Sequence, residues 1–300
     1  MVKKPFFLKQ VMMRRVLYSL IPIYLFALYF YGIRLIFLSI VVFSGGILTE
    51  YIMEKRVKKN VSEAVLVTSL LFVLSLPPLT PWWVALIGII FGVLFGKEVF
   101  GGFGRNPFNP AIVGRLFIYI TFPNIMTLSW MVPGKFGIDV ITTATPLKLM
   151  RESNEAFDIV KMFFGFRAGS MGESFIFLIL LGAIYLIYTK TASWRIMLST
   201  FLTSFILIYA FYFSGIVNYP LQYLMSGSLI FVIVFMATDP ISAPKKQISH
   251  WYYGIIIGVV AVLIRTFSLF PEGTSFAVLF ANTFAPLIDE LVSLKKKVKI

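Results

Sequence analysis

Residues 106–110 read Asn-Pro-Phe-Asn-Pro, and residues 282–286 read Asn-Thr-Phe-Ala-Pro. Both segments have the form Asn-x-Phe-x-Pro, and each lies at the start of an apolar segment or inside one. In a chain with 32 Phe residues, so short a pattern can also recur by chance. We interpret the recurrence as an internal duplication, which predicts that the two halves of the chain share one architecture.

The composition is that of a protein solvated by lipid. Of 300 residues, 59% are hydrophobic and 13% are charged, and the mean hydropathy is +0.89. A soluble domain carries about a quarter charged residues, whereas a membrane-spanning helix needs about 20 mostly apolar ones. We therefore predict about ten transmembrane helices, near residues 17–31, 35–53, 64–76, 82–95, 111–130, 174–188, 196–215, 221–237, 252–269 and 275–291.

Ten spans and one duplication together predict the fold. Five spans per half is an odd number, so the second half would enter the membrane inverted. The expected fold is an all-α polytopic membrane protein, with five-helix repeats at 1–130 and 174–300 joined by an external loop at 131–173. Such a long loop usually has a function. Its segments 146–157 and 159–166 have the amphipathic spacing of helices that lie along a membrane surface.

The basic residues predict the orientation. Most of the 27 Lys and Arg residues fall at the termini and in alternate connections, which places both termini in the cytoplasm and the long loop outside the cell membrane. The net charge of +14 is then a topology signal and not a nucleic-acid footprint, because no polar fold presents it to phosphates. The first apolar run is long, so we interpret it as a span and not as a cleaved signal peptide.

Several kinds of site are excluded by composition. The chain has no cysteine, which excludes disulfides, thiolate metal sites and cysteine-bound iron–sulfur clusters. The only histidine, His250, stands beside Trp251 at a predicted helix entrance and is expected to anchor that helix at the interface. We therefore predict no metal site.

Polar residues near two predicted span ends are candidates for binding. A turn at 101–111 carries glycines, which allow close approach of a ligand, and prolines, which free backbone carbonyls. It could cradle a planar cofactor or an ion, or it could be a tight turn that only packs helices. Asp239 ends another span, where it could bind a cation, orient a cofactor or cap local backbone N–H groups.

Charged residues inside or beside the spans need partners. Lys97, Glu98 and Arg115 border the glycine turn and are expected to neutralise one another. Arg265 lies near the outer end of its span and is expected to extend its guanidinium to the interface.

Five segments carry a resemblance to a known family, at 101–111, 122–130, 137–147, 236–244 and 280–289. They closely resemble the D subunit of the Rnf complex and, to a large extent, the related B subunit of the sodium-translocating NADH:quinone reductase. Only about fifteen residues precede the first predicted span. That favours the D subunit, since the B subunit carries a longer N-terminal extension.

The resemblance implies a covalent flavin. In that family the pattern Asp-x-x-Ser/Thr-x-Ala-Thr is recognised by an external flavin transferase, which esterifies the last threonine to the phosphate of FMN. Asp139, Thr142 and Ala144 match the pattern, Thr143 fills its free position, and Thr145 is the attachment point. On the residues alone, a Thr-Thr-Ala-Thr run before a proline is typical of an ordinary helix cap.

The resemblance also implies a role in electron transfer. The chain would be a subunit of an ion-translocating ferredoxin:NAD oxidoreductase, relaying electrons across the membrane while the complex moves Na⁺ or H⁺, with ferredoxin and NAD sites on other subunits. A second, non-covalent flavin, riboflavin, is expected near residues Gly102, Gly104, Asn106, Asn109 and Asp239. The alternatives are a quinone-reductase B-type subunit, a urea- or ammonium-type channel, which also uses an inverted five-plus-five bundle, and a passive anchor for redox partners.

Overall fold

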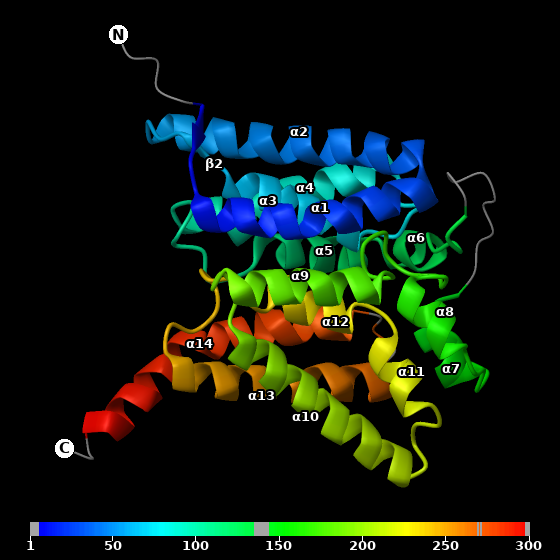
Figure 1. Cartoon of the computed structure of the whole chain (residues 1–300). Coiled ribbons are helices and arrows are strands. Elements are labelled where there is room, and N and C mark those ends of the chain that lie inside the picture. Colours follow the sequence, from blue (N-terminus) through cyan, green and yellow to red (C-terminus); the bar gives the residue numbers. More distant parts are fainter. Residues whose placement is uncertain (1–5, 135–143, 269, 271, 298–300) are drawn as a thin grey trace.

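The computed structural model describes residues 6–134, 144–268, 270 and 272–297. Helices form most of the molecule and lie in layers, with two short strands at one end (Figure 1). The strands β1 (Phe7–Leu8) and β2 (Val61–Ser62) pair in parallel. The helices are α1 (Val11–Tyr31), α2 (Ile33–Arg56), α3 (Ala64–Ser75), α4 (Trp82–Gly96), η1 (Glu98–Phe100), α5 (Pro110–Thr121), α6 (Pro123–Leu128), α7 (Pro146–Glu152), α8 (Ile159–Phe164), α9 (Ile176–Tyr188), α10 (Trp194–Phe213), α11 (Pro220–Met225), α12 (Leu229–Phe231), η3 (Val232–Met236), α13 (Gln247–Phe267) and α14 (Gly273–Lys297).

Among the residues that the structure describes, six stretches are long and apolar enough to cross a membrane: α1, α2, α4 with η1, α10, α13 and most of α14. The same residues include three shorter apolar helices, α3, α5 and α9. Large apolar side chains are exposed along several of the long helices. This is the surface expected of a multi-pass membrane protein, because lipid replaces water around it.

Two of the predicted spans are interrupted. The span expected at 111–130 divides at Phe122, where α5 ends and α6 begins with Pro123, since a proline cannot donate the hydrogen bond that would continue the helix. The span expected at 221–237 divides at Ser226 and Gly227 into α11, α12 and the π-helical turn η3. Gly227 has a φ of +61°, which ends α11.

Arg265 fills the second interruption. Its Nη2 donates to the carbonyl oxygens of Tyr223 at 2.7 Å and Ser226 at 3.0 Å, two carbonyls that belong to the interrupted helix. The side chain is 2% exposed. The expectation that Arg265 extends to the interface is therefore wrong, because the carbonyls freed by the break attract the guanidinium inward.

The helices pack in two groups. In the first, α2 packs on α3 and α4, and α4 packs on α5; in the second, α10 packs on α13, and α13 packs on α14. Contacts of α1 with α9 and of α5 with α14 join the groups, which occupy the upper and lower parts of Figure 1. The strongest packing partners thus recur in the same order in both halves.

Glycine permits the closest of these contacts. A Cβ on Gly92 of α4 would lie 2.5 Å from the carbonyl oxygen of Pro110. A Cβ on Gly114 of α5 would overlap the carbonyl oxygen of Gly88. Small residues let two membrane helices approach backbone to backbone, so α4 and α5 are held at a distance that a larger side chain would not allow.

The two ends of the bundle are distinct. The strand β1 and the C-terminal end of α14 lie on one side of the molecule, and α7 and α8 lie on the opposite side (Figure 1). Both short helices fall within the long loop at positions close to those predicted. We refer to these sides as the terminal end and the loop end.

Candidate functional site

A cavity of about 580 Å³ lies at the loop end. It is lined from α5, from α6 and the residues after it, from α7 and the two residues before it, and from segments that precede α9, α12 and α14. Small-molecule sites typically have volumes of about 300–1,000 Å³. A ligand of the size of a flavin nucleotide therefore fits the volume.

Thr145 and Ala144 both line this cavity. Thr145 is half-buried and occupies the N-cap position of α7, with φ −69° and ψ 150°. The extended ψ is the conformation expected before Pro146, which begins the helix. The hydroxyl makes no capping hydrogen bond to the first turn of α7. Thr145 thus has the backbone position of a helix cap, but its side chain does not form the capping hydrogen bond.

The other residues of the flavin pattern are only partly placed. Asp139, Thr142 and Thr143 lie outside the described residues. Lys148 and Arg151 of α7, one and two turns beyond Thr145, line the same cavity, as does Trp130. The cavity therefore combines the hydroxyl of Thr145 with two exposed cations and an aromatic side chain, and Glu152 of α7 also lines it.

A buried ionic cluster forms another wall. Arg115 of α5 lies between two acidic residues, with Nη1 donating to the carboxylate of Glu173, and with Nη2 2.8 Å and Nε 2.7 Å from the two oxygens of Glu272. All three side chains are at most 3% exposed. Burial raises the pKa of Glu173, and the Arg115 guanidinium opposes that rise. Buried charges such as these three are stable only when they are paired.

This cluster corrects a sequence-based expectation. We expected Arg115 to neutralise Glu98, but α5 carries Arg115 away from the glycine turn, and its partners come from the segments before α9 and α14. The sequence did contain one indication of these partners. Glu173 and Glu272 each stand just before an apolar segment, where a carboxylate needs a positive partner.

A second, small cavity of about 50 Å³ lies between the two halves at the terminal end. Asn106, Asn109 and Asp239 all line it, together with Phe103 and Lys97. Three of the five residues expected near a second flavin thus meet at one place. A volume of 50 Å³ is close to that of one or two waters, and in this arrangement it does not accommodate a flavin ring.

The two glycines from that prediction have other neighbours. Gly102 has a φ of +85°, and a Cβ there would overlap the carboxylate of Glu54. Gly104 has a φ of +88° and open space where a Cβ would be. The glycine turn therefore serves at least one close contact, with Glu54.

Asn109 and Asp239 make structural hydrogen bonds. The Oδ1 of Asn109 accepts from the N–H of Ala111 and so caps α5, while its Nδ2 donates to the carbonyl of Met236 at 3.3 Å. Asp239 Oδ1 accepts from the N–H of Ile241 at 3.1 Å. Burial raises the pKa of Asp239, and this backbone hydrogen bond opposes the rise. The capping interpretation of Asp239 is confirmed.

Comparison with known proteins gives the family. A profile of the NQR2, RnfD, RnfE family matches residues 4–297. The chain belongs to this family. That result agrees with the resemblance found in the motifs, and it covers both the Rnf-type and the quinone-reductase-type subunits.

Individual members of the NQR2, RnfD, RnfE family are similar over most of the chain. The B subunit of the Na⁺-translocating NADH-quinone reductase of Pseudomonas paraeruginosa is 40% identical over 245 residues, which are 78% of this chain and 61% of that protein. The corresponding proteins of Yersinia pestis and Chromohalobacter salexigens are 37% and 38% identical, over 84% and 87% of this chain and 64% and 66% of those proteins. The chain thus spans about three fifths of the length of such relatives.

Proposed function

We propose that this chain is a membrane subunit of an ion-translocating redox complex and carries FMN on Thr145 through a phosphoester. The observation that carries the proposal is the position of Thr145, which faces a cavity of about 580 Å³ with its backbone extended and its hydroxyl not engaged in capping. Membership of a family of redox subunits supports the same role. Bound FMN would supply one-electron chemistry, which suits a relay between centres.

The residues around Thr145 suit a flavin nucleotide. A flavin transferase must reach the hydroxyl, and the small neighbour Ala144 leaves it accessible. Lys148 and Arg151 line the same cavity as Thr145 and could hold a phosphate, although Lys148 is already 3.9 Å from the carboxylate of Glu152. Trp130 offers an aromatic wall for a ring system. The buried Arg115 cluster fixes the segments before α9 and α14, which also border the cavity.

We further propose the two inverted five-helix repeats, in the inner membrane, with the terminal end cytoplasmic and Thr145 external. The matching order of packing partners, α2–α4–α5 and α10–α13–α14, supports the repeat. The placement of β1 and the end of α14 opposite α7 supports termini on one side and the Thr145 loop on the other. The partners are then other subunits of the complex, the transferase and the coupling ion, Na⁺ or H⁺.

Riboflavin as a second flavin stays a separate prediction. The meeting of Asn106, Asn109 and Asp239 supports the region, but its cavity would have to widen to admit a ring. Denaturing the purified complex and separating the released flavins by chromatography checks this prediction. Release of riboflavin in amounts equal to the chain is the expected outcome.

The attachment is tested in the denatured protein. The chain is expressed with a flavin transferase, unfolded, and examined for flavin fluorescence that migrates with the polypeptide. Thr145→Ala should abolish that fluorescence. The matched control is Thr127→Ala, which removes another threonine from the same cavity and should leave the fluorescence unchanged. Covalent flavin retained in Thr145→Ala would refute the assigned residue.

The alternative function is that of a B-type subunit of a quinone reductase, which the names of the similar proteins favour. The family match favours either redox role over a urea- or ammonium-type channel. The purified complex separates the two redox roles. Reduction of NAD by reduced ferredoxin indicates the Rnf type, and oxidation of NADH by a quinone indicates the B type.

A further inference from the structure

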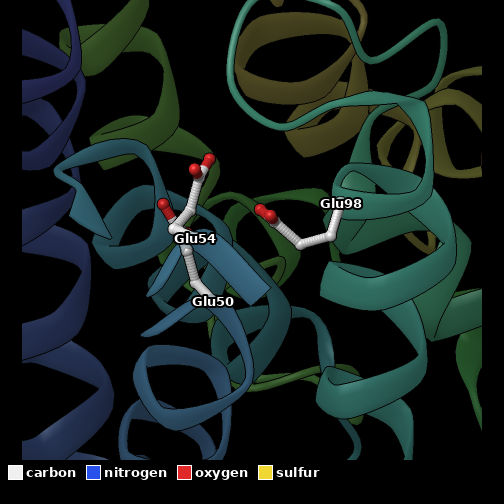
Figure 2. Close-up of side chains that lie close together, drawn as sticks. All are labelled: Glu50, Glu54 and Glu98. Carbon is white, nitrogen blue, oxygen red and sulfur yellow. The ribbon is translucent and has the colours of Figure 1, made fainter. Parts of the chain in front are cut away.

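Three glutamates meet at the terminal end, away from the Thr145 cavity. Glu50 and Glu54 lie one turn apart on the same face of α2, and Glu98 reaches toward them from η1 (Figure 2). One carboxylate oxygen from each lies within 4.8 Å of the other two. All three side chains are buried.

Glu50 already has a complete set of partners. Its Oε2 accepts from Lys97 Nζ at 2.5 Å, and its Oε1 accepts from the Ser62 N–H at 2.7 Å and from the Ser62 hydroxyl at 2.6 Å. Lys97 also donates to Ser62 Oγ at 2.8 Å. Glu50 and Lys97 therefore form a closed pair that fixes one side of the cluster.

Glu54 and Glu98 are not satisfied in the same way. Glu54 Oε2 and Glu98 Oε1 are buried and have no hydrogen-bond partner among the described residues. The two residues are 4% and 8% exposed. Lys97 Nζ is 3.7 Å from Glu98 Oε1, beyond hydrogen-bond distance. By contrast, the nearby carboxylate of Glu63 receives bonds from Arg14 on both oxygens.

The charges do not balance. Three carboxylates face one ammonium group, and an uncompensated charge in a buried site costs several kcal/mol. Gly102 packs against the Glu54 carboxylate without a Cβ, which leaves room for that group to stay beside the backbone. A bound cation, or a proton on one of the carboxyl groups, would balance the charge of the cluster, and the unpartnered oxygens of Glu54 and Glu98 are the positions open to it.

We propose that Glu54 and Glu98, beside the closed pair of Glu50 and Lys97, bind a hard cation of the size of Na⁺ or Ca²⁺. Carboxylate oxygens bind Ca²⁺ at about 2.3–2.6 Å, so oxygens on opposite sides of such an ion lie up to about 5 Å apart. The separation here, up to 4.8 Å, fits that range, and Na⁺ is similar in radius. Mg²⁺ binds at about 2.0–2.1 Å and would require the side chains to move closer.

The site does not depend on the flavin. It depends on the proposed function only in that an ion-translocating complex would supply Na⁺ as a ligand. Cation binding is measured without electron flow, whereas the flavin is read as fluorescence of the denatured chain. Failure of one proposal is therefore distinguishable from failure of the other.

The test compares thermal unfolding of the full chain in detergent with NaCl, KCl, CaCl₂ or choline chloride at equal ionic strength. NaCl or CaCl₂ should raise the melting temperature of the wild type by about 2–6 °C over choline chloride. Glu54→Gln keeps the shape of the side chain and removes one unpaired charge, so it should lose this cation-dependent rise and melt no lower than the wild type in choline chloride.

The control is Glu152→Gln, which changes an exposed glutamate of α7 and should keep the full response. Line broadening of the ²³Na resonance, displaced by CaCl₂ and absent in Glu54→Gln, provides a direct measure of binding. A melting temperature that is the same in all four salts would overturn the proposal, and so would an equal cation response in Glu54→Gln and the wild type.

Discussion

At Thr145 the backbone positions the side chain. Pro146 disfavours helical dihedral angles in the residue before it, so Thr145 stays extended while α7 begins one residue later. A threonine inside the helix would turn its hydroxyl toward the carbonyl groups of the preceding turn. The proline therefore separates the attachment point from the helix that supports it.

Pro146→Ala should lower covalent flavin incorporation, because alanine allows the helix to extend through Thr145. The measurement is flavin fluorescence per denatured polypeptide after expression with the transferase. Pro123→Ala, which changes the proline that begins α6, is the control and should leave incorporation at the level of the wild type. Full incorporation in Pro146→Ala would show that the extended conformation is not required.

Arg115→Leu should be among the most damaging single changes at the loop end. It leaves Glu173 and Glu272 buried without a partner, which costs about 3–5 kcal/mol. Thermal unfolding in detergent should show this as a large drop in melting temperature or a loss of monodisperse protein. Arg56→Leu, at an exposed position, should change stability by less than about 0.5 kcal/mol. Equal stability of the two variants would contradict the assigned pairing.

Single residues were predictable only where their chemistry is local. The extended backbone of Thr145 follows from Pro146, and the cap at Asp239 follows from the tendency of an Asp side chain to accept from the backbone N–H two residues later. The partners of Arg115 come from positions 58 and 157 residues away, and nothing in the local sequence specifies that pairing. Arg265 was misjudged for the same reason, because the break that attracts it lies in another helix.

At the scale of elements, the contact between α4 and α5 depends on the absence of side chains. Gly92 and Gly114 let the two backbones touch. Lys97 directly follows α4 and Arg115 lies in α5, so these helices connect the terminal end with the loop end. The spacing of α4 and α5 therefore affects both candidate sites.

Gly114→Ala should destabilise this helix pair. Its Cβ would meet backbone of α4, which cannot move aside as a side chain could, so a loss of about 1–3 kcal/mol is expected. The melting temperature in detergent reports the change. The control is Ser44→Ala on an exposed face of α2, which should be close to neutral. A neutral Gly114→Ala would mean that the helices can separate without cost.

Most helices were located correctly from the sequence, but the prediction missed two interruptions, of which only the one at Pro123 has a clear local cause. Apolar length identified the six long stretches, since lipid demands about 20 apolar residues of a span. The break at Ser226 and Gly227 lies in a short Ser-Gly-Ser segment between two apolar stretches. It exists because Arg265 can satisfy the freed carbonyls, a condition set by tertiary structure.

At the scale of the whole molecule, several polar contacts link the two groups of helices, and two of these links lie beside the cavities. Asn109 of the first half donates to the carbonyl of Met236 in the second, and Arg115 binds Glu173 and Glu272 of the later segments. One link lies beside the small cavity and the other beside the large one. If the two halves moved relative to each other, both contacts would have to break, or the residues that form them would have to move together.

The orientation in the membrane is tested with single cysteines, because the chain has none of its own. Lys148→Cys should react with a membrane-impermeant thiol reagent added to intact cells, and Lys58→Cys should react only after the cells are opened. Both positions are exposed, so burial does not explain a difference. The reverse pattern would invert the proposed topology.

The location of β1 and the end of α14 opposite α7 has a practical consequence. An affinity tag fused after residue 300 would anchor the purified protein to a gold electrode with the Thr145 face turned toward the solution. Soluble electron donors could then be offered to that face alone, and the current they produce would measure transfer in one defined direction.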